Sequence, residues 1–309
     1  MAQTKHQIQA LLAEAGSSPR HRFGQNFMID GNLVRLVAEA GRIESGDVVI
    51  EVGPGTGTLT EELLSRDADV VAVEIDRDLA AMLRLRFADE PRFKLIEGDA
   101  LAGKHELNAE LRAHLAAVRS TGGLSSEPAP QPQCEPAVLR TAANYGRPVK
   151  LVANLPYNIA SPLVIELLIA GVELLAFTVQ KEVADRLRAQ AGSDDYGPLT
   201  VMAQLLANVE VLRTLPPQAF WPAPKIDSGL VRMTRADQLG ADAAEFGRFV
   251  HQLFAARRKT LRKALSQMGI EDGEQFLTSL GIDPQLRPER LTPPQCLELF
   301  RRRRESPAA

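Results

Sequence analysis

Short apolar runs alternate with segments of helical spacing along the middle of the chain, and this alternation restricts the fold more than any other feature. Runs of the length of buried strands occupy residues 48–52, 70–75, 93–97, 149–153 and 174–179. Two more strands are expected at 209–213 and 230–234. Strands that alternate with helices form a parallel sheet covered by helices on both faces. The sequence therefore predicts an α/β, doubly wound domain over residues 31–235.

Composition sets the broad class of the protein. The chain has 309 residues, of which 45% are apolar and 24% are charged, as in soluble globular proteins. No apolar run approaches the ~20 residues that cross a bilayer, and the first residues lack the pattern of a signal peptide. The cysteines, Cys134 and Cys296, are isolated and fit neither a disulfide framework nor a zinc site. We therefore expect a cytoplasmic protein without a metal.

A glycine-rich turn follows the first of these strands. The turn reads Glu-Val-Gly-Pro-Gly-Thr-Gly-Thr over residues 51–58, and its glycines let a ligand approach the backbone closely. NAD, FAD and S-adenosylmethionine enzymes all use such a turn. Glu74 ends the second strand, where a carboxylate can bind both ribose hydroxyls, and Asp99 ends the third, where it can accept from an adenine amine. A dinucleotide enzyme would also need a hydride-transfer pocket, and no segment marks one.

The stretch Asn154-Leu155-Pro156-Tyr157 follows the fourth strand, at the sheet edge where α/β folds bind ligands. The side-chain amide of Asn154 and a backbone carbonyl of the next residues offer neutral hydrogen-bond acceptors, and the tyrosine offers a flat face. This combination suits an uncharged planar amine such as the N6 group of adenine. A capped turn is the alternative reading, because Asn and Pro both favour turns.

Two regions depart from the alternating pattern. Residues 101–148 form an insertion in which 106–118 can be helical, and Gly, Pro, Ser and Gln in the following segment are typical of a mobile loop. From about residue 241 apolar residues recur at three- and four-residue steps, which predicts helices. Residues 225–309 carry 15 Lys+Arg and 11 Asp+Glu, whereas residues 1–224 carry 21 and 28. The basic C-terminal part indicates contact with a polyanion, or else a solvated helical surface.

Together these segments resemble the ribosomal RNA small subunit adenine dimethyltransferase family over nearly the whole chain apart from roughly 101–148. The resemblance rests on six motifs in order: residues 23–30 (FGQNFMID), 51–57 (EVGPGTG), 154–157 (NLPY), 180–183 (QKEV), 220–228 (FWPAPKIDS) and 257–262 (RRKTLR). It implies a seven-stranded Rossmann-like methyltransferase sheet and a small all-helical C-terminal domain. On this basis we expect a basic N-terminal segment at 1–30, the catalytic domain at 31–235 and an RNA-binding domain at 241–309.

The resemblance also implies roles for single residues. The positions that match the family's S-adenosylmethionine site are Asn26, Met28, Gly53, Gly55, Glu74, Asp99 and Asn154. Asn154, Leu155, Pro156 and Tyr157 match its adenine-amine motif, and Phe220 resembles an aromatic that stacks on the target base. Met28 stands where leucine is usual, a change that conserves volume. The insertion at 101–148 is longer than is typical of the family.

The expected reaction is dimethylation of two adjacent adenines near the 3′ end of small-subunit (16S) ribosomal RNA within an assembling 30S subunit, by a monomeric enzyme. Phosphate contacts are expected from a cationic helix with Arg257, Arg258, Lys259, Arg262 and Lys263, and residues 301–304 could add to them. Three alternatives stay open: the related large-subunit adenine methylase of macrolide resistance, a non-catalytic RNA-binding assembly factor, and a dinucleotide oxidoreductase.

Overall fold

The computed structural model describes residues 3–103, 106–120 and 148–305. Within them no helix is both long and apolar enough to cross a membrane. The chain divides into two compact units, one made of Met1–Lys181 with Val211–Thr234 and the other of Glu182–Glu210 with Arg235–Ala309. This division differs from the expected boundary near residue 235, because residues 182–210 belong with the C-terminal helices.

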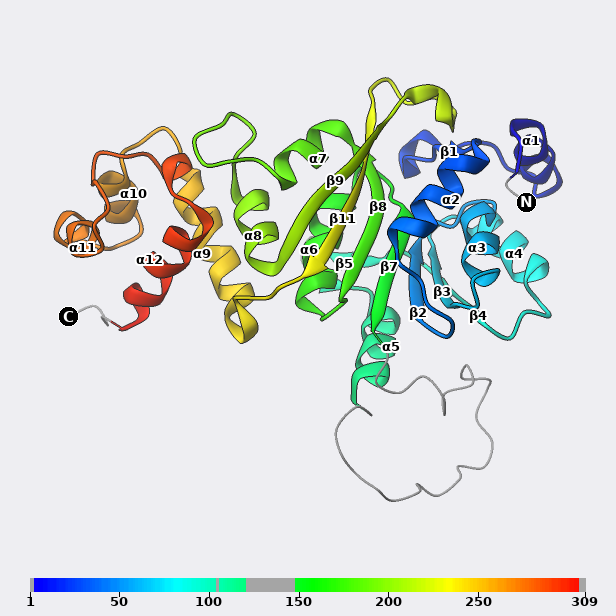
Figure 1. Cartoon of the computed structure of the whole chain (residues 1–309), viewed down its shortest axis with the longest axis horizontal. Coiled ribbons are helices and arrows are strands. Elements are labelled where there is room, and N and C mark those ends of the chain that lie inside the picture. The colour runs from blue at the N-terminus through cyan, green and yellow to red at the C-terminus, as the bar shows by residue number, and fades with distance from the viewer. Residues whose placement is uncertain (1–2, 104–105, 121–147, 306–309) are drawn as a thin grey trace, which may run out of the picture. The chain divides into compact units, whose positions relative to one another are not determined.

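A seven-stranded sheet in the order β4-β3-β2-β7-β8-β11-β9 forms the centre of the fold (Figure 1). Its strands are β2 (Val48–Val52), β3 (Asp69–Glu74), β4 (Phe93–Glu97), β7 (Val149–Asn154), β8 (Leu174–Gln180), β9 (Ala207–Leu215) and β11 (Ser228–Arg235). The first five pair in parallel, as the alternating pattern predicts. Every residue of β2 is buried, which explains its continuous apolar composition. The seven-stranded α/β architecture expected from the sequence is confirmed.

The sheet is mixed rather than wholly parallel. Strand β11 runs antiparallel to β8, with Ser228 opposite Gln180 and Thr234 opposite Leu174. The expectation of a parallel doubly wound sheet is therefore wrong at this edge. No helix separates β9 from β11 along the chain, apart from the short 3-10 turn η2 (Pro217–Ala219), so the long crossover that a parallel connection needs is missing.

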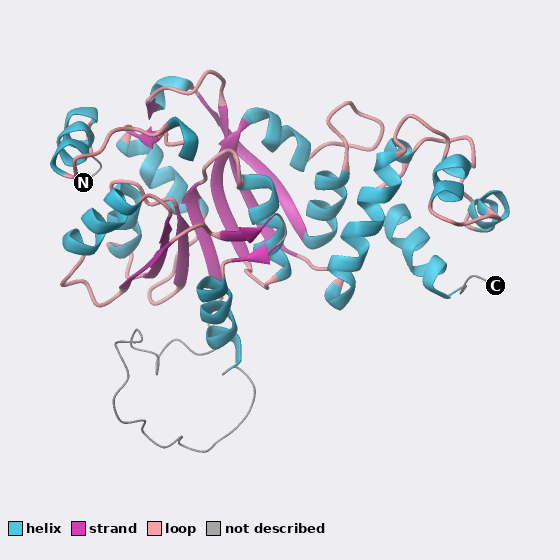
Figure 2. Cartoon of the chain, turned by 180° about the vertical axis from the view of Figure 1, so that it is seen from behind, coloured by secondary structure: helices cyan, strands magenta, loops and turns pink. Residues whose placement is uncertain are grey.

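Helices cover both faces of the sheet. Helix α2 lies in front of the sheet in Figure 1, and the view from behind in Figure 2 shows helices over the opposite face. Side chains of α2 and α3 form one apolar cluster with Val49, Val152 and Leu230 of the strands. The helices of this unit are α1 (Lys5–Glu14), α2 (Gly31–Ala40), α3 (Thr58–Leu64), α4 (Arg77–Arg86), α5 (Ala109–Ser120) and α6 (Ala160–Ile169).

The N-terminal segment is more structured than its basic, polar sequence indicates. Thr4 and Gln7 form a capping box at the start of α1, and Ile8 and Leu12 bury its apolar side. Strand β1 (Phe27–Met28) then pairs antiparallel with β10 (Phe220–Trp221), so two segments almost 200 residues apart lie side by side. This small second sheet was not predicted, because strands of two residues carry no periodicity.

Part of the predicted insertion at 101–148 is ordered. Residues 101–103 and 106–107 form a short antiparallel ladder, β5 (Leu101–Gly103) with β6 (Glu106–Leu107), and α5 follows. The helix predicted from residue 106 therefore begins three residues later, since the first residues belong to the ladder. The loop predicted to be mobile falls largely on residues 121–147, which lie outside the described part of the chain, as does Cys134.

The second unit is helical around an aromatic core. Phe246 and Phe249 of α9 pack against Phe300 of α12, with ring centroids 5.3 Å and 5.5 Å from it. Cys296 is buried and free. The helices of this unit are α7 (Lys181–Leu187), whose first residue belongs to the other unit, α8 (Pro198–Leu206), α9 (Ala243–Ala255), α10 (Leu261–Gln267), α11 (Gly273–Ser279) and α12 (Pro293–Glu305). The helices predicted after residue 241 are thus present.

Candidate active site

A pocket opens at the edge of the sheet where β2, β3, β4 and β7 end. The glycine turn, the acids after β3 and β4 and the segment after β7 meet there because parallel strands place their carboxyl ends along one edge. Residues 23–28 line the pocket from the N-terminal side. All seven residues expected to bind cofactor line it: Asn26, Met28, Gly53, Gly55, Glu74, Asp99 and Asn154. Their ligand contacts stay predictions.

Two glycines of the turn, Gly53 and Gly55, form a part of the pocket wall where a side chain would not fit. Gly53 and Gly55 have φ angles of 72° and 61°, in the left-handed region that favours glycine. A Cβ atom at Gly55 would lie 2.8 Å from Cε1 of Phe27. At these two positions the turn therefore brings its backbone up to the pocket, and at Gly55 the backbone also lies against the ring of Phe27.

Two buried carboxyl groups stand behind this wall. Glu74 accepts hydrogen bonds from the backbone N–H of Gly55 at 3.2 Å and of Asp76 at 2.9 Å. Burial raises the pKa of Glu74 to about 7, against the effect of these backbone donors. Burial also raises the pKa of Glu51 to about 8, while the hydroxyl of Thr60 donates to Glu51 at 2.6 Å and lowers it in part. Carboxyl groups whose pKa is raised to near 7 by burial are typical of functional sites.

Asp99 occupies a more open position. One of its carboxylate oxygens, Oδ1, accepts from the backbone N–H of Leu101 at 3.0 Å, and the residue is exposed. Among the described residues the other oxygen has no hydrogen-bond partner. A carboxylate that lines a pocket with one oxygen available is able to accept a hydrogen bond from an amine.

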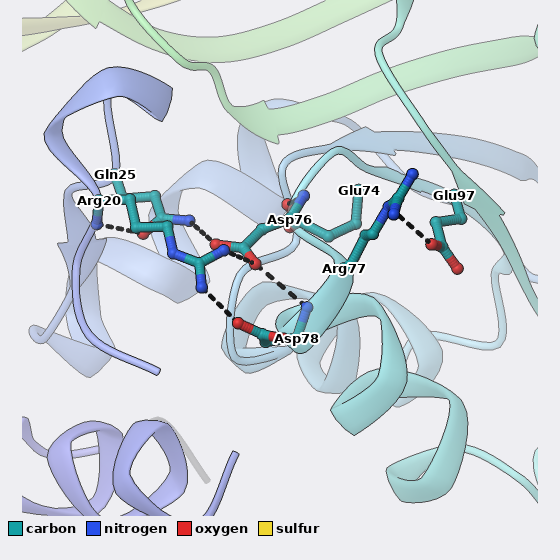
Figure 3. A network of polar contacts seen from close by, with 7 residues as sticks. All are labelled: Arg20, Gln25, Glu74, Asp76, Arg77, Asp78 and Glu97. Carbon is teal, nitrogen blue, oxygen red and sulfur yellow. Dashed lines mark hydrogen bonds and ion pairs between the residues drawn. The ribbon is translucent and has the colours of Figure 1, made fainter. Parts of the chain in front are cut away.

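A polar network fastens the N-terminal wall of the pocket to the loop after β3 (Figure 3). Arg20 donates to Asp76 Oδ1 at 2.7 Å and also forms an ion pair with Asp78. Gln25 donates to Asp76 Oδ2 at 3.0 Å and accepts from the backbone N–H of Arg20 at 2.7 Å. Asp76 is fully buried and lies two residues after Glu74. The network therefore holds residues 20–25 against the carboxylate side of the pocket.

Asn154 ends β7 at the inner end of the pocket, and both ends of its amide are bonded. The amide nitrogen donates to the backbone carbonyl of Asn26 at 2.6 Å. The amide oxygen accepts from the hydroxyl of Thr178, the residue directly opposite on β8. Asn154 thus joins the end of the central sheet to the N-terminal wall.

The other residues of the predicted amine motif differ in exposure. Pro156 lines the pocket, whereas Leu155 is 2% exposed and packs into the interior. The hydroxyl of Tyr157 lies 2.7 Å from that of Ser228, which is fully buried at the start of β11. Burial raises the pKa of Tyr157, so its phenol stays protonated at neutral pH. The contact with Ser228 fixes the half-buried tyrosine ring.

Phe220, expected to stack on the target base, is buried and is not among the residues that line the pocket. Its side chain is 2% exposed and belongs to the apolar cluster between α2, α3 and the sheet. A ring with no free face cannot stack on a base in this conformation, so the structure does not support the predicted stacking role. Sequence reasoning missed this burial, because it depends on the pairing of Phe220 with Met28 across the β1–β10 ladder.

Several residues of the site were not singled out from the sequence. Gln25 and Asn158 line the pocket, and Thr178 and Ser228 bind the predicted residues Asn154 and Tyr157. Gln25 and Ser228 stand inside recognised motifs, which is a usable signal. Thr178 stands between Phe177 and Val179 in β8, a strand that is otherwise apolar up to its last residue, Gln180. A polar residue inside this apolar run was the one signal that the sequence offered for it.

Replacing Glu51 by glutamine should flatten the pH dependence of stability. A carboxyl whose pKa is 4.5 in the unfolded chain and about 8 in the fold is protonated only in the native state between these values. Stability therefore falls as pH rises through this window, by at most ~1.4 kcal/mol per pH unit for one group. Melting temperatures from pH 5 to 8.5 should fall less for Glu51→Gln than for the wild type. Exposed Glu14→Gln makes the same formal charge change and should follow the wild type; a parallel loss in all three proteins would contradict the assignment.

Replacing Arg20 by methionine should loosen the N-terminal wall. Losing hydrogen bonds to a buried carboxylate should raise hydrogen exchange of the amides at 23–28 about ten- to a hundredfold. Arg77→Met is the control, since Arg77 is 89% exposed and its nearest contact with Glu97 is 4.0 Å (Figure 3). Equal exchange rates in both variants would show that Arg20 does not hold this segment.

Comparison with known proteins identifies relatives along almost the whole chain. The family model described as ribosomal RNA adenine dimethylase matches residues 16–304. A protein of Hahella chejuensis named ribosomal RNA small subunit methyltransferase A is 40% identical over 289 residues, covering 92% of each chain. A protein of the same name from Magnetococcus marinus is 41% identical over 298 residues, covering 94% of each.

Solved structures agree with this assignment. The crystal structure of a dimethyladenosine transferase from Plasmodium falciparum superposes with a TM-score of 0.66 at 21% identity, covering 90% of this chain and 98% of that one, and at this identity it supports the fold. The 23S rRNA methyltransferase ErmE superposes with a TM-score of 0.56 at 28% identity, covering 90% and 99%. The match over residues 16–304, together with relatives of about 40% identity, shows that this chain belongs to the ribosomal RNA adenine dimethylase family of methyltransferases.

Proposed function

We propose that this protein transfers methyl groups from S-adenosylmethionine to the N6 amines of two adjacent adenosines near the 3′ end of small-subunit rRNA, giving N6,N6-dimethyladenosine. One observation carries the proposal: Asn154 and Pro156 line the same pocket as the glycine turn, Glu74 and Asp99. An amine-binding group and a nucleoside-binding group therefore share one cavity. Membership in the family and the names of the relatives support this substrate.

The pocket has the donor and acceptor groups that S-adenosylmethionine requires. Glu74 already accepts two backbone N–H groups, which orient its carboxylate, and each oxygen keeps a lone pair for a ribose hydroxyl. Asp99 has an oxygen for the adenine amine. The backbone of Gly53–Gly55 and the carbonyl groups of residues 24–26 would surround the methionine part. Met28 completes the apolar side of the pocket.

The cofactor supplies an electrophilic methyl group on a sulfonium, and the protein orients the weakly nucleophilic amine toward it. In our proposal Asn154 Oδ1 and a backbone carbonyl of Leu155 or Pro156 accept the two amine hydrogens. These bonds aim the nitrogen lone pair into the pocket, and their negative dipole ends stabilise the positive charge that develops on nitrogen. Such alignment is worth up to roughly 7–11 kcal/mol in model reactions. Water takes the acidic proton of the alkylated amine.

The target base must leave its stack to reach Asn154. Tyr157 is the aromatic side chain suited to contact the base, because it lies three residues after Asn154 in the same motif and its hydroxyl is anchored on Ser228. Aromatic contact with a flipped base is favourable and tolerant of sequence. Phe220 supports this region from the core instead.

Methyl transfer to purified subunits tests the proposal. Unmethylated small subunits and large subunits are incubated separately with labelled S-adenosylmethionine, and the modified nucleosides are identified. N6,N6-dimethyladenosine near the 3′ end of small-subunit RNA is the expected product. Label on the large subunit would select the activity named for ErmE. Cofactor binding without transfer to either would select an assembly factor, and no cofactor binding would revive the oxidoreductase reading.

Replacing Asn154 by alanine should abolish most turnover while cofactor binding persists. The variant loses the acceptor for one amine hydrogen. Removal of a group that acts only in the transition state lowers kcat and leaves cofactor affinity nearly unchanged. We expect a fall of at least a hundredfold in kcat, measured with small subunits, and a dissociation constant for S-adenosylmethionine within a few-fold of wild type. Near-normal turnover would rule out this role for Asn154.

The second unit has two basic clusters, at residues 257–263 and 301–304, and the first of them is divided between a turn and a helix. Arg257, Arg258 and Lys259 lie on the turn after α9, and Arg262 and Lys263 in the first turn of α10, so the expected cationic helix is interrupted. Arg257 donates to the carbonyl of Asp194 and Arg262 pairs with Glu274. Arg258, Lys259 and Lys263 are exposed, and their side chains have no ionic or hydrogen-bond partner in the described residues. These three cations are free to bind phosphates.

The terminal run 301–304 is engaged within its own unit. Arg301 donates to the carbonyl of Gln238, Arg302 pairs with Glu298, and Arg304 pairs with Asp242. The guanidinium of Arg303 lies 5.8 Å from the centroid of Phe249. RNA would have to compete with these partners, so this run contributes less to phosphate binding than the cluster at 257–263.

Replacing Arg258, Lys259 and Lys263 by glutamine should weaken binding of small-subunit RNA and reduce its salt dependence. Each lost phosphate contact makes the decline of log K with log salt less steep by ~0.7–0.9. For the three lost contacts we expect the magnitude of this slope to fall by about 2. Glutamine at 302–304 removes the same number of charges and should change the slope by less. An equal decrease in both triple variants would mean that net charge, rather than position, controls affinity.

The biological setting remains part of the proposal. An assembling 30S subunit is the expected substrate, because the two adenosines must be accessible for flipping. A cytoplasmic location and a monomeric state are expected with it, and sedimentation of the purified protein tests the second of these.

A further inference from the structure

We propose that Thr178 is a positioning residue whose hydroxyl holds the amide oxygen of Asn154 in the place where it accepts a hydrogen bond from the target amine. This inference rests on the proposed function and extends it to a residue outside the recognised motifs. Thr178 does not line the pocket; it acts through Asn154.

The two residues are held together by the sheet. Strands β7 and β8 pair in parallel, and Asn154 lies directly opposite Thr178 at the end of the ladder. Thr178 is fully buried, so no solvent competes for its hydroxyl. The hydroxyl donates to Asn154 Oδ1.

The orientation of the amide follows from its partners. A backbone carbonyl only accepts, so the Asn154 nitrogen must face the carbonyl of Asn26, 2.6 Å away. Oδ1 then faces Thr178, whose hydroxyl has a hydrogen to donate. A flipped amide would set its NH2 against the target amine, where two donors meet without an acceptor. The carbonyl of Asn26 thus sets which way the amide faces, and the Thr178 hydroxyl, by donating to Oδ1, holds the oxygen in that place.

The amide oxygen keeps capacity for substrate. A carbonyl-type oxygen has two lone pairs, and Thr178 uses one. The second is available to an amine hydrogen from the pocket side. A valine in this position would fill the same space in a buried strand and remove the donor.

The two methyl transfers should depend on this contact to different degrees. In the first transfer the two amine hydrogens bind two acceptors, Asn154 Oδ1 and the backbone carbonyl. If Oδ1 is no longer held in place, the carbonyl still orients the amine. After one methylation a single hydrogen remains. Loss of the Thr178 hydroxyl should therefore slow the second transfer more than the first.

The experiment compares Thr178→Val with Thr178→Ser in methyl transfer to small subunits, with S-adenosylmethionine affinity measured by calorimetry. Loss of one orienting hydrogen bond should lower kcat about tenfold in Thr178→Val. The cofactor dissociation constant should stay within twofold, and N6-methyladenosine should accumulate. Thr178→Ser keeps the donor and should restore both kcat and the dimethylated product.

A double-mutant cycle separates positioning from packing. In an Asn154→Ala background the amide is gone, so adding Thr178→Val should change the residual rate by less than twofold. A tenfold effect that persists in that background would overturn the inference. So would full kcat in Thr178→Val, or a serine variant as impaired as the valine one.

These outcomes are distinct from failure of the proposed function. A wild-type protein that transfers no methyl group to small subunits would refute the function. An active wild type with a fully active Thr178→Val variant would refute the positioning role alone.

Discussion

The parallel pairing of β2, β3, β4 and β7 is the constraint on which the rest of this structure depends. Parallel strands end along one edge of a sheet, so segments more than 50 residues apart in sequence become neighbours there. The glycine turn, Glu74, Asp99 and Asn154 each follow a different strand and meet in one pocket for this reason. A shift of one strand by one residue would turn its side chains to the opposite face of the sheet. Because these strands are apolar on both faces, their own composition opposes such a shift only weakly. The helices that pack on each face oppose it more strongly.

The N-terminal wall covers one side of this edge, so that the edge forms a pocket. It is held at two places, by Arg20 and Gln25 on the buried carboxylate of Asp76 and by the carbonyl of Asn26 on the amide of Asn154 (Figure 3). The second contact orients the same side chain that our proposal places against the substrate. One wall of the pocket and the orientation of the Asn154 amide therefore both depend on this segment being in place.

Charge alone does not locate the RNA surface. The two basic clusters of the second unit look alike in sequence, yet the one at 301–304 meets acidic, carbonyl and aromatic partners of its own unit. In the cluster at 257–263 Arg257 and Arg262 are paired in the same way, whereas the side chains of Arg258, Lys259 and Lys263 have no such partner among the described residues. A cation already paired has lost part of its advantage in meeting a phosphate, because the new contact must replace the old one.

The sequence by itself determined the seven-stranded α/β sheet, the glycine turn and the place of residues 154–157 at the end of a strand, because these depend on local periodicity and on residues close to strand ends. It also determined the family, through motifs spread over most of the chain. Tertiary structure alone decided the antiparallel strand β11, the β1–β10 ladder that buries Phe220, and the contacts of Asn154 with Asn26 and Thr178. Each of these joins residues distant along the chain, and a pairing of that kind leaves no periodic trace in either partner.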